Sequence, residues 1–135
     1  MMKYFYSVAA LLLVLGCADT EQASHTPLLG TTWNLAELNN EKIQHPGPQT
    51  PHLSFEAERV NGNDGCNNFF GGYTLDENNL KFGMLGSTRM ACPQIKDFDM
   101  ELNKLMSAIT SYRIGGNKLE LFENDKLLAS FVAAE

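Results

Sequence analysis

The stretch GCNNFFGGY, residues 65–73, does most to decide how this chain folds. Its glycines let the backbone turn sharply or approach another strand closely. Asn67 can hydrogen-bond neighbouring backbone groups and so hold a tight loop. The aromatic residues Phe69 or Phe70, together with Tyr73, supply apolar area for a core. We therefore expect a tight turn that leads directly into a strand.

Short strands separated by Gly, Asn and Asp turns account for most of the chain beyond residue 30. The segments with strand character are 31–38, 53–55, 69–73, 80–82, 112–114, 118–122 and 127–131. The run NGNDG at 61–65 suits backbone with positive φ, so we expect a turn there.

One segment has the period of a helix instead. Its apolar residues recur at spacings of three and four and form a stripe, with charged side chains on the other faces. The stripe consists of Ile95, Phe98, Leu102, Leu105, Ile109 and Tyr112. The pattern predicts an α+β fold: a strongly bent antiparallel β-sheet, rolled or closed into a partial barrel, with one amphipathic helix packed on it.

The amino terminus has the pattern of a lipoprotein signal peptide over residues 1–16. Its apolar run is shorter than the about 20 residues that a permanent membrane helix needs. Residues 14–17 (VLGC) resemble a bacterial lipobox, which implies cleavage before Cys17 and acylation of that residue. An ordinary secretory signal followed by a chance cysteine is the alternative.

The same resemblance suggests a cellular location for the protein. Ala18, rather than an aspartate, follows Cys17, which favours the outer membrane, facing the periplasm. Residues 17–27 are polar and read as a lipidated cysteine with a flexible tether. Residues 28–135 form the single domain. The expected contact with the membrane is the acyl anchor on Cys17.

The charge of the chain excludes some partners. The formal net charge is −6 over the full sequence, and removal of Lys3 with the leader makes it more negative. A surface of this sign argues against nucleic acid and against adhesion to anionic lipid.

Two cysteines, Cys66 and Cys92, lie within the domain. In an oxidising periplasm they can form a disulfide, which would close the loop 66–92 at a gain of roughly 3.5 kcal/mol in the chain-entropy model. Two buried free thiols remain the alternative. Their separation, without a CxxC pair, argues against a metal site, and we expect no metal and no cofactor.

The sequence offers little for catalysis. Its histidines are His25 in the tether and His45 and His52 beside a proline-rich loop, and none is paired with a nucleophile. Glu56 and Glu58 would share one strand face, where exposed carboxylates are common. We therefore expect no catalytic residue and no enzymatic activity.

Several of these segments together resemble the META domain, also called the HslJ-like domain. The resemblance covers about 28–132 and is carried by GCNNFFGGY, by STRMAC at 87–92 and by the paired strands near the carboxyl end. The residues that match the family motif are Trp33, Gly65, Asn67, Phe69, Gly71, Tyr73, Thr88, Arg89 and Met90. Arg89 is interpreted either as a structural salt bridge or as an anion or ligand contact.

The resemblance implies a small, lipid-anchored bacterial envelope protein with no established enzymatic activity. Relatives are linked to heat stress, to tolerance of an aminocoumarin antibiotic and, in a eukaryote, to parasite virulence. Two hypotheses follow: a non-catalytic module that binds a protein or envelope component, or a carrier of a small apolar ligand inside the rolled sheet. The module requires a filled interior and the carrier an empty one.

Overall fold

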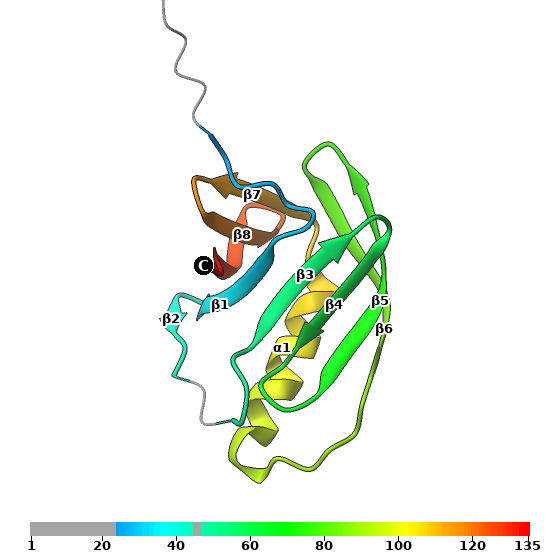
Figure 1. Cartoon of the computed structure of the whole chain (residues 1–135), viewed down its shortest axis with the longest axis vertical. Helices are drawn as coiled ribbons and strands as arrows, with labels where there is room; N and C mark the ends of the chain where they lie inside the picture. Colours follow the sequence, from blue (N-terminus) through cyan, green and yellow to red (C-terminus); the bar gives the residue numbers. More distant parts are fainter. Residues whose placement is uncertain (1–23, 45–46) are drawn as a thin grey trace, which may run out of the picture.

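The computed structural model describes residues 24–44 and 47–135 (Figure 1). The leader, Cys17 and His45, on which several expectations rest, lie outside these residues. The elements in chain order are β1 (Thr32–Leu38), β2 (Glu41–Lys42), β3 (His52–Glu56), β4 (Arg59–Asn63), β5 (Asn68–Asp76), β6 (Asn79–Ser87), η1 (Pro93–Ile95), α1 (Lys96–Ala108), β7 (Ser111–Gly115), β8 (Lys118–Glu123) and β9 (Lys126–Ala133).

The strands form one antiparallel sheet that closes on itself. It has nine strands in the order β2-β1-β3-β4-β5-β6-β7-β8-β9, and β1 pairs with β9 as well as with β3. The short strand β2 only extends the β1 hairpin, whose turn residues Asn39 and Asn40 both have positive φ. The predicted fold class, a bent sheet approaching a barrel with one helix, is confirmed.

The barrel has one weak seam, between β6 and β7. These strands pair at a single position, Asn79 with Ser111, whereas β6 pairs with β5 along most of its length. The helix α1 joins β6 to β7 and, with the residue after it, contributes Leu102, Leu105, Met106 and Ile109 to the core. Figure 1 shows α1 lying behind β3, β4 and β5, on the inner side of the sheet. The helix therefore fills the gap that the seam leaves.

The barrel interior is filled by side chains. Its residues form one hydrophobic cluster to which every strand except β2 and β7 contributes at least one buried side chain, and β7 adds half-buried ones. The bulkiest side chains with less than 2% exposure include Trp33, Phe55, Phe131, Leu53, Leu80, Ile95 and Met106. Trp33, which is fully buried, keeps its indole N–H satisfied by donating to the carbonyl of Leu28 at 3.1 Å.

The structure corrects the expected turn at 61–65. Asn61, Gly62 and Asn63 belong to strand β4, and the turn is confined to residues 64–67. Gly62 serves close packing, because a Cβ there would lie 2.4 Å from the Phe69 ring and 2.4 Å from the His52 carbonyl oxygen. The sequence alone does not distinguish a glycine required for close packing against a neighbouring strand from a glycine required for a turn.

Three smaller expectations also change. The helical stripe ends early: α1 stops at Ala108, Ile109 is extended with ψ 133°, and Tyr112 lies in β7. Glu56 and Glu58 do not share a strand face, because Glu58 sits in the β3–β4 turn with φ 62°. The segment before β1 is held against the barrel, since the Thr26 N–H donates to the Gly116 carbonyl at 3.0 Å.

No helix among the described residues has the length and apolar character needed to cross a membrane.

The packing of α1 generates a stability prediction. Leu102→Ala removes a side chain that is 4% exposed, so unfolding free energy should fall by about 3 kcal/mol. Met100→Ala, on the same helix with 64% of its surface exposed, should change it by less than about 0.5 kcal/mol. Chemical denaturation followed by circular dichroism measures both. Equal losses in the two variants would contradict the packing described here.

Candidate functional site

The turn between β4 and β5 is built from side chains that replace backbone hydrogen bonds. The Asp64 carboxylate accepts from the backbone N–H groups of Cys66 at 3.0 Å and Asn67 at 2.6 Å. The Asn63 amide oxygen accepts from the Gly65 N–H at 2.7 Å, and Gly65 itself has φ +101°. Asn63, Asp64 and Asn67 are all buried, with exposures of 0%, 2% and 7%. Their polar groups are therefore committed to holding the turn.

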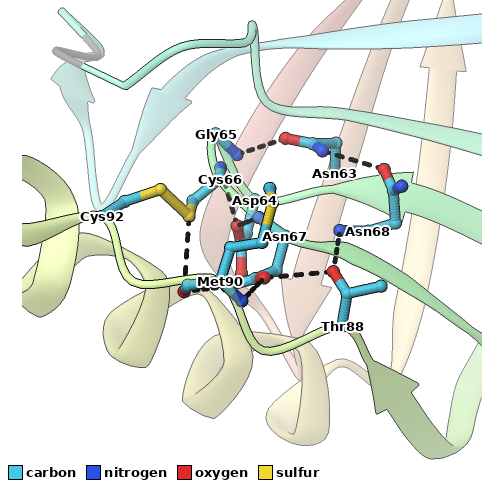
Figure 2. The surroundings of a disulfide bond; sticks show 9 residues. All are labelled: Asn63, Asp64, Gly65, Cys66, Asn67, Asn68, Thr88, Met90 and Cys92. Atoms are coloured by element: carbon cyan, nitrogen blue, oxygen red, sulfur yellow. Dashed lines mark hydrogen bonds between the residues drawn. A yellow bond between two sulfur atoms is a disulfide. The ribbon is translucent and has the colours of Figure 1, made fainter.

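Asn67 acts as an extra peptide unit for the segment that follows β6 (Figure 2). Its amide oxygen accepts from the Met90 N–H at 2.6 Å, and its amide nitrogen donates to the Met90 carbonyl at 3.2 Å. The same oxygen accepts from the Thr88 hydroxyl at 3.0 Å. One side chain thus satisfies both backbone groups of a residue that lies in no helix or strand.

Thr88 joins the two segments a second time. Its hydroxyl accepts from the Asn68 N–H at 3.1 Å, and its own N–H donates to the Asn68 carbonyl at 2.9 Å. The Asn63 amide nitrogen donates to the Asn68 side-chain oxygen at 2.9 Å. These contacts extend the β5–β6 ladder into irregular backbone, so residues 88–90 remain attached to the barrel after β6 ends.

A disulfide joins Cys66 to Cys92, with a Cα–Cα distance of 6.1 Å (Figure 2). Of the two alternatives that the sequence left open, the structure therefore contains the bridge. It links the β4–β5 turn to the residue immediately before η1. Side-chain hydrogen bonds and the covalent bond thus fix the same two segments, and together they set where α1 begins.

The polar and sulfur groups of this turn are engaged in holding it. The cysteines are oxidised, and the Asp64 carboxylate is occupied by backbone donors. Within residues 24–44 and 47–135, no cluster of three or more His, Cys, Asp or Glu side chains could hold a metal ion. The motif is therefore a structural clamp in the part of the chain described here.

Comparison with protein families identifies the domain that contains this clamp. A family model described as the META domain matches residues 26–135, which include the barrel, the helix and both clamp segments.

The chain belongs to the META domain family.

Two solved structures share the fold of this META domain. An NMR structure of a protein from Burkholderia xenovorans has a TM-score of 0.61 at 24% identity, and the match covers 99% of each chain. A second NMR structure has a TM-score of 0.59 at 23% identity and covers 76% of this chain and 88% of the other. At these identities the likeness shows the fold alone. No significant match was found among curated proteins.

The META domain is not a known enzyme family, and most of its motif residues here are structural. Trp33 and Phe69 are buried in the core. Gly71 faces the Met84 carbonyl oxygen, which a Cβ would approach to 2.7 Å. The Tyr73 ring packs edge-on against Phe55, and its hydroxyl donates to the Glu56 carbonyl at 2.6 Å. Burial raises the pKa of the Tyr73 phenol further above neutral.

Arg89 differs from the other motif residues. Its side chain is exposed and forms no ion pair with any carboxylate in the described part of the chain. Of the two interpretations of Arg89, the structural salt bridge is therefore absent there, and the anion or ligand contact stays a prediction. The cause of the exposure is local: Thr88 and Met90 both turn toward Asn67, which leaves the residue between them facing solvent. Met90 contributes through its backbone, since its side chain is 55% exposed.

Asn63 and Asp64 belong to the clamp but were missed as site residues from the sequence. An Asn-Asp pair in a turn-rich run signals only a turn. The one available sign was that the pair is followed, after Gly65, by Cys66 and Asn67, which places three polar side chains in one short turn.

The clamp generates a second stability prediction. Asn67→Ala removes the side-chain partner of the part-buried N–H and carbonyl of Met90 and should lower the unfolding free energy by about 1–3 kcal/mol. Asn61→Ala is the matched control, because the half-buried Asn61 side chain forms no hydrogen bond within the described protein. Its effect should stay within about 0.5 kcal/mol. Denaturation under oxidising conditions compares the two, and similar values for both would exclude the role given to Asn67.

Proposed function

We propose that this META domain protein is a non-catalytic, lipid-anchored module of the bacterial cell envelope that binds a protein or another envelope component. The acyl anchor is on Cys17, and the outer membrane facing the periplasm is the proposed location. The role of such a module is support of stress or antibiotic tolerance.

One observation carries the binding part of the proposal. The barrel interior is occupied by Trp33, Phe55, Phe131 and their neighbours, each almost fully buried. A carrier needs an enclosed space for its ligand, whereas this interior is packed. The grooves found in the described residues open to solvent on the outside of the sheet and helix. Recognition therefore takes place on the outer surface.

The anchoring part is supported by the sequence and by the geometry of the first described residues. The segment that enters the domain is fixed beside the β7–β8 turn through Thr26 and His25, whose ring nitrogen accepts from the Gly116 N–H at 3.3 Å. An acylated Cys17 would then hold the domain near the membrane by a short tether. The disulfide agrees with an oxidising compartment.

The proposal predicts that Cys17 carries covalent lipid and that the barrel holds no apolar ligand. In cells fed radioactive palmitate, the wild type should be labelled and Cys17→Ala should not. Equal labelling of both proteins, or no labelling of the wild type, would contradict the anchor.

The purified wild type should show only protein and its covalent lipid by native mass spectrometry. A stoichiometric, non-covalently bound apolar molecule would favour the carrier.

A further inference from the structure

A groove of about 550 Å³ lies on the outer face of β3, β4 and β5. Residues His52, Ser54, Arg59, Asn61, Asn68 and Phe70 contribute outward-facing side chains to it. It lies on the opposite side of these strands from the core, and none of its lining side chains takes part in the disulfide. The volume lies in the range of small-molecule sites.

The groove contains one flat aromatic surface that is held in place. Phe70 is 47% exposed and stands opposite Gly86 on β6. A Cβ on Gly86 would come within 3.0 Å of the Phe70 ring, so the ring rests directly on that backbone. An aromatic face supported in this way gives contact area at little cost in conformational entropy. The apolar C–H face of a sugar ring is the kind of surface that packs on it.

Several hydrogen-bonding groups around Phe70 are unused. The His52 Nδ1 lies 2.9 Å from the Thr50 carbonyl, which can only accept, so Nδ1 carries the proton and neutral His52 presents Nε2 as an acceptor. The Asn68 side-chain oxygen accepts from Asn63, which leaves its amide nitrogen free to donate. The Asn61 side-chain amide forms no hydrogen bond within the described protein, either as donor or as acceptor. Together they offer donors and acceptors to hydroxyl groups.

The charge of the groove is opposite to that of the chain. Arg59 lines it, and no aspartate or glutamate does, although the chain carries a net charge of −6. Glu56 is the cross-strand neighbour of Arg59 but forms no ion pair with it. The Arg59 guanidinium is therefore available to a carboxylate on a ligand.

The backbone of the groove argues against a peptide strand as the ligand. Strand β3 pairs with β1 and β4, β4 with β3 and β5, and β5 with β4 and β6. Strand addition requires a free sheet edge, which the middle of a sheet does not have. Side chains must carry the recognition.

We infer that this groove binds an acidic saccharide, with a sugar ring on Phe70, its hydroxyls on His52, Asn61 and Asn68, and its carboxylate on Arg59. The inference rests on the proposed function and names the class of envelope component that the module binds.

The test is ligand-observed NMR titration of the purified full-length protein in detergent. The probes are cellobiouronic acid, a disaccharide with one carboxylate, and cellobiose, its neutral counterpart. The wild type should bind the acid about fivefold more tightly than the neutral sugar. Phe70→Ala should weaken both about tenfold, and Arg59→Gln should remove the preference while leaving cellobiose unchanged.

Matched controls lie outside the groove. Leu75→Ala changes a similarly exposed apolar residue on β5, and Arg89→Gln changes an exposed arginine; both variants should bind both sugars like the wild type. Circular dichroism should show that all four variants melt cooperatively near the wild-type temperature. Asn61→Ala is a second variant that keeps Phe70 and Arg59, and it should weaken both sugars severalfold.

The inference fails if the wild type shows no saturable binding of either sugar up to about 20 mM. It also fails if cellobiose binds as tightly as the acid, or if Leu75→Ala loses as much affinity as Phe70→Ala. If Cys17 is labelled by palmitate but neither sugar binds, the saccharide inference is wrong and the anchored module stands. If the sugars bind but Cys17 is not labelled, the groove inference stands and the lipid anchor is wrong.

Discussion

The architecture of this domain depends on the pairing of one side-chain amide with one residue's backbone. Asn67 supplies an acceptor and a donor to Met90 where the chain has left β6 and has not yet begun α1. These contacts are part-buried, and two such hydrogen bonds together stabilise the chain by about 1–3 kcal/mol where it crosses this region. The asparagine provides them from a turn that Asp64 and Asn63 hold in shape.

The clamp matters because of where the barrel is weakest. The seam between β6 and β7 has a single paired position, and the helix that covers it begins a few residues after Met90. Cys92 ties the start of that helix to the turn through Cys66. A fixed starting point lets Leu102, Leu105 and Met106 reach the interior in register, so the clamp determines how the open side is filled. The polar atoms of the motif are already hydrogen-bonded within this arrangement. Recognition of a partner is therefore left to the outer face of the sheet.

Periodicity was enough to predict the fold class. The spacing of Ile95, Phe98, Leu102 and Leu105 identified the helix, and alternation identified most strands. It failed at Gly62, which packs under Phe69 within a strand, and at Tyr112, which continued the helical spacing after the helix had ended. Both failures have one cause: tertiary contacts override a local pattern that is compatible with two conformations.

The site was predictable to a smaller extent. Asn67 could be expected to hold a loop, but nothing local indicated that its partner was Met90, because that contact joins distant positions in the chain. For the same reason the sequence left Arg89 with two interpretations, of which the salt bridge is absent from the described residues. The groove residues come from three strands and meet only in the folded sheet.

Amide hydrogen exchange of Met90 tests the central claim most directly. The residue lies in irregular backbone, so only the Asn67 amide can protect its N–H. We predict protection of the Met90 N–H close to that of the core strands, with fast exchange at Arg89 beside it. Exchange of Met90 as fast as that of Arg89 would contradict it.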